Sequence, residues 1–74
     1  MHAFDRVLRA FPSVPVESLE SIQQKIPDMD MGRIERIVQR AQVGGFIRST
    51  PEGFHVTEVG ADYLARRWGR APTT

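Results

Sequence analysis

The segment DMGRIERIVQRAQVGGFIR, residues 30–48, determines how the chain is expected to fold. Its apolar residues recur at i, i+3, i+4 and i+7, the spacing of one face of an α-helix: Ile34, Ile37, Val38 and Ala41. Asp30 is a good N-cap, and Gly44-Gly45 ends the run, because glycine takes the left-handed C-terminal conformation without steric cost. The segment predicts a helix over Met31–Val43.

The next segment, FIRSTPEGFHVTE (46–58), predicts a β-hairpin. Apolar and polar residues alternate on both sides of Pro51-Glu52-Gly53, a turn sequence. An isolated hairpin is marginally stable in water, so this one is expected to pack on helices through its apolar residues: Phe46, Ile47, Phe54 and Val56. Thr57 is the expected cap of a last helix, Glu58 to Trp68, with four side chains turned inward: Val59, Tyr63, Leu64 and Trp68.

Two further helices are predicted upstream. Residues 3–11 carry an apolar stripe of Phe4, Val7, Leu8 and Phe11, with Asp5, Arg6 and Arg9 on the opposite side. Pro12 ends this helix, because proline disfavours helical geometry at the residue before it. A second helix is expected to begin near Pro15, with Glu17 at its positive end, and to end at Pro27-Asp28. Its apolar face is Val16, Leu19, Ile22 and Ile26.

Composition limits the classes of protein to be considered. The chain has 74 residues, a net charge of +1 and no cysteine, which fits one domain without disulfides. No apolar run approaches the ~20 residues of a membrane span, and the N-terminus lacks the layout of a signal peptide, so a cytoplasmic location is expected. Nine of the ten basic residues are arginine, the side chain that forms paired hydrogen bonds with phosphate and guanine. The nearly balanced net charge, however, neither favours nor opposes a nucleic-acid partner.

Catalysis, metal binding and cofactor binding are not expected. His2 and His55 match no metal-ligand spacing, and the serines lack a nucleophile-elbow motif. Gly44-Gly45 has neither the lysine nor the strand-then-helix setting of a phosphate-binding loop. The carboxylates are scattered over helix surfaces. We therefore predict that the protein is not an enzyme.

The order of three helices, a hairpin and a closing helix, together with two segments, resembles the winged helix-turn-helix domains of bacterial transcriptional regulators. Residues 30–48 are similar to their recognition helix and first wing strand, and FHVTEVGADYL (54–64) to their second wing strand and closing helix. The resemblance implies a mainly α fold with a small β-hairpin wing, in one domain over 1–70 with a flexible tail at 71–74. It also implies an intracellular, prokaryotic or phage-like protein that binds double-stranded DNA.

In that family the helix at 30–43 enters the major groove. Its first half would face base edges through Met31, Gly32, Arg33 and Arg36, and its second half the backbone through Gln39 and Arg40. Arg48 and His55, beside the wing tip, would contact phosphate or a minor groove; the other interpretation is that they are exposed strand residues. The acidic side chains nearby, Asp28, Asp30 and Glu35, offset these arginines, and the hairpin tip carries only Glu52.

The closing helix leaves two questions open. Arg66, Arg67 and Arg70 form a basic cluster that would contact nucleic acid or lie solvated at the negative helix end. The aromatic residues suggest a homodimer, with Trp68 either in the core or at the interface, through surfaces of Phe4, Phe11, Tyr63 and Trp68. The alternative to DNA binding is a protein-interaction module that uses the mixed charges of 28–40 and the aromatic first and last helices.

Overall fold

The computed structural model describes residues 2–68; Met1 and residues 69–74, which include Arg70 and the predicted tail, lie outside the described part. The elements in chain order are α1 (Ala3–Ala10), α2 (Glu20–Lys25), α3 (Met31–Val43), β1 (Ile47–Thr50), β2 (Gly53–Val56) and α4 (Glu58–Trp68). The described chain is thus mainly helical, with one two-stranded antiparallel sheet. The predicted bounds of α3 and α4 are confirmed.

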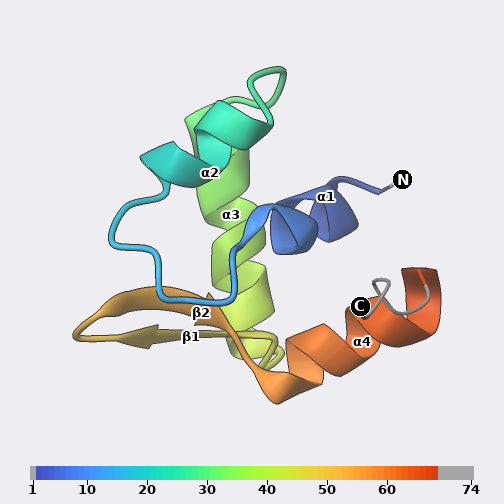
Figure 1. Cartoon of the computed structure of the whole chain (residues 1–74). Helices are drawn as coiled ribbons and strands as arrows, with labels where there is room; N and C mark the ends of the chain where they lie inside the picture. The colour runs from blue at the N-terminus through green and yellow to red at the C-terminus, as the bar shows by residue number, and fades with distance from the viewer. Residues whose placement is uncertain (1, 69–74) are drawn as a thin grey trace.

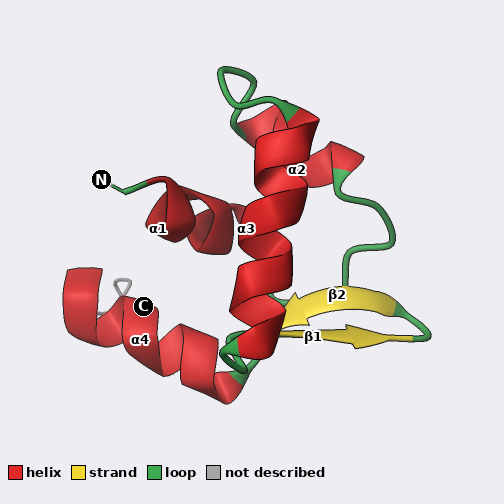
Figure 2. Cartoon of the chain, turned by 180° about the vertical axis from the view of Figure 1, so that it is seen from behind, coloured by secondary structure: helices red, strands yellow, loops and turns green. Residues whose placement is uncertain are grey.

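The longest helix, α3, organises the molecule. Figure 1 shows α1 and α2 on one side of α3, the hairpin beside its C-terminal end, and α4 leading away from the hairpin. α1 contacts α2, α3 and α4, so the first helix links the two ends of the chain. Seen from behind, in Figure 2, α3 lies in front along its whole length, and no other element covers that side.

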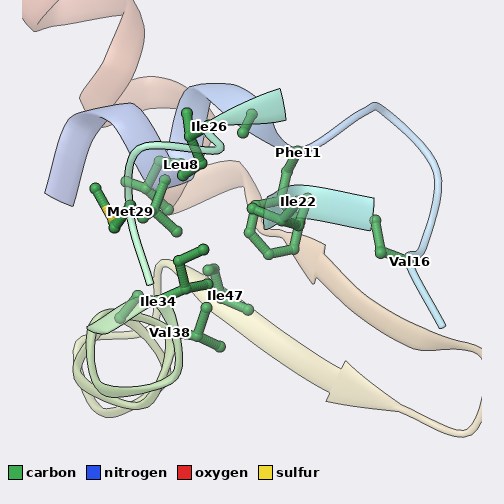
Figure 3. Packing of buried hydrophobic residues seen from close by; sticks show 12 residues of the cluster. Leu8, Phe11, Val16, Ile22, Ile26, Met29, Ile34, Val38 and Ile47 are labelled. Carbon is green, nitrogen blue, oxygen red and sulfur yellow. The ribbon is translucent and has the colours of Figure 1, made fainter. Parts of the chain in front are cut away.

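The core forms where α1, α2, α3 and β1 meet. Its largest fully buried apolar side chains are Leu8, Ile22, Ile34 and Val7. Figure 3 shows Ile34 and Val38 of α3 lying against Ile47 of β1, with residues of α1 and α2 above them. The hairpin therefore shares the core of the helices, as the instability of an isolated hairpin requires.

The segment between α1 and α2 differs from the prediction. α2 begins at Glu20, not near Pro15, because Val16 is extended and pairs with Phe54 of β2. The amide of Val16 donates to the Phe54 carbonyl (2.7 Å), and the amide of Phe54 donates to the Val16 carbonyl (2.9 Å). Val16 thus adds a third extended segment to the hairpin, which fixes the hairpin against the helices.

One glycine makes this contact possible. Gly53 has φ +127°, a conformation that side chains rarely adopt, and a Cβ there would collide with the backbone of Val16. Gly53 pairs with Thr50 across the turn, and the next pairs along the strands are Ser49 with Phe54 and Arg48 with His55. Gly53 is therefore required by the close approach of the Val16 backbone as well as by the turn.

The faces of α1 and α4 were predicted only in part. In α4, Gly60 is buried and Tyr63 and Leu64 are half-buried, whereas Val59 is 55% exposed, so the inward orientation predicted for Val59 is wrong. Trp68 is 42% exposed, but its indole Nε1 is turned toward α1, where it donates to Asp5. In α1, Asp5 is not on the solvent side as predicted but fully buried. Within residues 2–68 no helix is long and apolar enough to cross a membrane.

Candidate nucleic-acid interface

The exposed side of α3 is the surface that the predicted binding residues share. Asp30 caps this helix, as predicted: its carboxylate accepts a hydrogen bond from the backbone amide of Arg33 (3.3 Å). The inward residues Ile34, Val38 and Ala41 are buried, which fixes the rotation of the helix. The exposed positions of α3 therefore lie away from the core, and Figure 2 shows α3 in front, with no other element covering that side of the helix.

Three arginines lie in one line on this side. Arg33, Arg36 and Arg40 are exposed and spaced at i, i+3 and i+7, which places them within about 60° of one another around the helix axis. None of the three forms a salt bridge with any residue of the 2–68 segment. Like charges at these spacings repel by roughly 0.2–0.5 kcal/mol per pair, so the line stabilises neither the helix nor the fold.

The acids of α3 were expected to offset the charge of these three arginines, but the positions of the acids around the helix make that offset smaller. Glu35 lies about 100–160° around the helix from the three arginines, and none of them is three or four residues from it. Asp30 lies three residues before Arg33 and keeps its charge while it accepts from the Arg33 amide as the N-cap. Arg36 and Arg40 are therefore separate from the acids of α3, and Arg33 alone has one close by.

Asp28 is neutralised by an arginine from another helix. Both guanidinium nitrogens of Arg6 donate to its two carboxylate oxygens, at 2.8 and 2.6 Å. The hydrogen bond from Arg6 lowers the pKa of Asp28, and the same bond raises the pKa of Arg6. Asp28 thus carries a partner of its own, and its charge is not available to offset the arginines of α3.

The other residues of the predicted site fall into two groups. On α3, Gly32 and Gln39 are exposed, whereas Met31 is half-buried. On the hairpin, Arg48 and His55 are cross-strand partners, and the alternation of strand side chains puts them on the face opposite Ile47 and Val56. Arg48 is exposed and forms no salt bridge among the described residues, whereas His55 is half-buried.

The arginines of α1 and α4, in contrast, have partners. Arg66 pairs with Asp62 (3.1 Å), and Arg67 with Asp5 (2.7 Å). The guanidinium of Arg9 lies over the Trp68 ring, 5.7 Å from its centroid. The prediction that Arg66 and Arg67 belong to an unbalanced basic cluster is therefore wrong for these two.

One carboxylate, on α1, is buried against expectation. Asp5 accepts hydrogen bonds from three side chains of α4: Tyr63 Oη at 2.7 Å, Arg67 Nε at 2.7 Å and Trp68 Nε1 at 3.0 Å. Burial by itself raises the pKa of Asp5, but these hydrogen bonds and the charge of Arg67 outweigh it, and the pKa lies below its usual value. The bond to Asp5 raises the pKa of Tyr63. The sequence signal that could have indicated this site is the spacing of its three donors, which lie at i, i+4 and i+5 on one helix.

The aromatic residues assigned to a dimer surface are used mainly within the chain. Phe4, Phe46 and Tyr63 form three edge-on pairs, with ring centroids 5.3–5.8 Å apart. Phe11 is buried at 9% exposure. Of the four predicted interface residues, only Trp68 is largely exposed.

No group of three or more metal-ligating side chains occurs within residues 2–68. The arrangement instead offers an exposed helix whose arginines can contact an anionic polymer. Comparison of the chain with protein-family models, curated proteins and solved structures finds no match.

Proposed function

We propose that the chain is a winged helix-turn-helix domain that binds double-stranded DNA, with α3 in the major groove and the hairpin as the wing. The observation that carries the proposal is the distribution of the arginines. Those on α1 and α4 have acidic or aromatic partners, whereas Arg33, Arg36, Arg40 and Arg48 are left without acidic partners among the described residues. Cations that repel one another and have no acidic partner destabilise the free protein slightly, but they favour binding to a polyanion, because each one that contacts a phosphate releases a counterion.

The dimensions support the same arrangement. α3 has 13 residues, a length of about 20 Å, and its exposed side is free of other elements (Figure 2). The major groove, about 12 Å wide, admits one α-helix. In this arrangement Arg33 and Arg36 read base edges, Arg40 and Arg48 contact phosphates, and sequence preference would make the protein a transcriptional regulator.

The test is a titration of labelled mixed-sequence duplex, followed by fluorescence anisotropy, over a series of salt concentrations. On mixed-sequence duplex, where in most registers Arg33 and Arg36 find no preferred base pair, all four arginines can contact phosphates, which predicts a slope of log K against log salt of roughly −3 to −4. Arg36→Gln should weaken binding about tenfold. Arg9→Gln is the matched control, because it removes the same charge from α1, which packs against the other side of α3.

Two results would overturn the proposal. One is the absence of binding at ~50 mM salt, where phosphate contacts are strongest. The other is an equal effect of Arg36→Gln and Arg9→Gln, which would mean that only net charge matters.

A protein-interaction module remains the alternative, and one observation favours it. Val43 is 86% exposed at the end of α3, and the hairpin tip carries the exposed acid Glu52. An apolar side chain exposed on the helix proposed to enter the groove suits a protein surface better than phosphate. The same titration separates the two functions, since this module would not bind duplex.

A further inference from the structure

The start of α3 presents an acid beside an arginine. Asp30 lies three residues before Arg33, and both residues are exposed. One carboxylate oxygen of Asp30, Oδ2, accepts from the Arg33 amide at 3.3 Å, whereas Oδ1 accepts no hydrogen bond from any residue of the 2–68 segment. Neither side chain forms a salt bridge within that segment. This end of the helix therefore offers a hydrogen-bond acceptor and a guanidinium donor, both without partners among the described residues.

The exposed residue between them, Gly32, has no side chain. A Cβ at this position would lie 3.2 Å from Oδ2 of Asp30, so a larger residue would crowd the carboxylate. Glycine also lets a bound molecule approach the backbone closely. In the proposed arrangement this turn of α3 enters the major groove, so the carboxylate of Asp30 and the side chain of Arg33 can both reach the edge of a base pair.

An acid on a DNA-facing turn opposes phosphate contact, because like charges repel, but it matches one kind of base pair. In the major groove a G·C pair presents two acceptors, guanine N7 and O6, followed by the N4 amino donor of cytosine. Arginine donates to both guanine acceptors, and a carboxylate accepts from the cytosine amino group. Arg33 and Asp30 together thus match a G·C pair. An A·T pair, whose amino donor lies between two acceptors, matches them less well.

The next arginine on this edge is placed for the neighbouring base pair. Arg36 lies about 4.5 Å from Arg33 along the helix axis and within about 60° around it, and base pairs are stacked ~3.4 Å apart. We propose that the preferred duplex contains two adjacent G·C pairs with both guanines on one strand, an inference that rests on the DNA binding proposed above. Arg33 and Asp30 read one pair, and Arg36 reads the guanine of the other.

The experiment compares two labelled duplexes of equal length by fluorescence anisotropy. Both have the same flanks of alternating A·T pairs, and they differ only in the two central base pairs, which are GG in one duplex and AA in the other. The wild type should bind the GG duplex at least about tenfold more tightly, because each good bidentate contact discriminates against the wrong base. Arg33→Gln should reduce this preference at least about fivefold, because glutamine pairs with adenine.

Asp30→Asn separates base reading from helix capping. Asparagine caps a helix as well as aspartate does, so the variant should fold. It lacks the negative charge and pairs with adenine, so its affinity for the AA duplex should rise and the preference for GG should fall at least about threefold. Arg40→Gln is the matched control. It removes a charge from the same edge of α3 at the position expected to contact phosphate, so it should weaken binding to both duplexes and leave their ratio unchanged.

Three results would overturn the inference. They are equal affinity of the wild type for the two duplexes, an unchanged preference in Arg33→Gln, and an Asp30→Asn variant with both affinities unaltered, as a purely capping role predicts. Equal, salt-dependent binding to both duplexes would leave the proposed function intact. The absence of binding to either duplex would refute the proposed function together with the inference.

Discussion

Replacing Asp5 with asparagine should destabilise the protein more than any other single change to a charged residue. The carboxylate is fully buried and accepts three hydrogen bonds from α4. Asparagine has the same shape, but its NH₂ group donates and would face donors. Asp5 thus joins the first helix to the last one through three side-chain hydrogen bonds.

The magnitude follows from the geometry. Hydrogen bonds to a charged group contribute about 1.5–3 kcal/mol each, but the cost of burying the carboxylate offsets much of the sum. The Arg67 side chain is 43% exposed, so water screens its contribution. We expect Asp5→Asn to lower the free energy of unfolding by about 2–4 kcal/mol, out of a total of about 4–11 kcal/mol for a chain of this length.

Urea unfolding followed by fluorescence measures this loss, because Trp68 is the single tryptophan and lies at the site. Asp62→Asn is the matched control: it removes an acid that also pairs with an arginine of α4 but is 63% exposed, and should cost less than about 0.5 kcal/mol. Tyr63→Phe removes one donor only and should cost about 1–2 kcal/mol, which keeps the test informative if Asp5→Asn does not fold.

The pH dependence has a definite sign. The folded pKa of Asp5 lies below the ordinary value of 3.8, so its stabilisation is complete above that value and is lost as pH falls through the folded pKa. The difference in stability between wild type and Asp5→Asn should therefore shrink as the pH is lowered below about 4. A difference that is independent of pH, or an Asp5→Asn loss no larger than that of Asp62→Asn, would refute this reasoning.

Three further predictions concern the hairpin and its contacts. Gly53→Ala should lower the free energy of unfolding by about 2–3 kcal/mol, because it strains the backbone and collides with Val16; urea titration measures it, and a neutral effect would contradict the described turn. Gly60→Ala should destabilise by at least about 1 kcal/mol although alanine favours helices, because its Cβ would lie 2.5 Å from the Phe46 carbonyl oxygen; a rise in melting temperature would be inconsistent with that contact. Glu52→Lys should tighten duplex binding roughly three- to tenfold at ~50 mM salt if the hairpin tip approaches phosphate; unchanged anisotropy curves would place the tip away from DNA.

Local signals in the sequence were sufficient for the two helices that flank the hairpin. Asp30 and Thr57 each cap a helix through a side chain, and Gly45, with φ +81°, ends α3 in the predicted glycine pair. Each of these interactions joins residues only a few positions apart, so the types and spacing of the residues are enough to predict it. The position of the hairpin turn follows for the same reason, because Pro51, Glu52 and Gly53 are adjacent turn-forming residues.

Contacts between distant residues could not be predicted in the same way. Val16 looks like the first residue of an apolar helical stripe, but its pairing with Phe54 holds it extended. Asp5 looks like a solvated residue, because nothing near it in sequence indicates that Tyr63, Arg67 and Trp68 meet it in the fold. In both cases a tertiary partner overrides a local preference.

The proposed DNA binding depends on where the charges lie, because a net charge of +1 favours neither binding nor its absence. Asp5, Asp28 and Asp62 form ion pairs with arginines of α1 and α4. Each pair is neutral, so neither these acids nor their arginine partners add to the charge of the α3 surface. Arg33, Arg36 and Arg40 remain along one edge of α3, with Glu35 turned to another edge. A polyanion that contacts this edge meets three cations, with Asp30 beside the first of them, and the number of cations that contact phosphates sets the number of counterions released on binding.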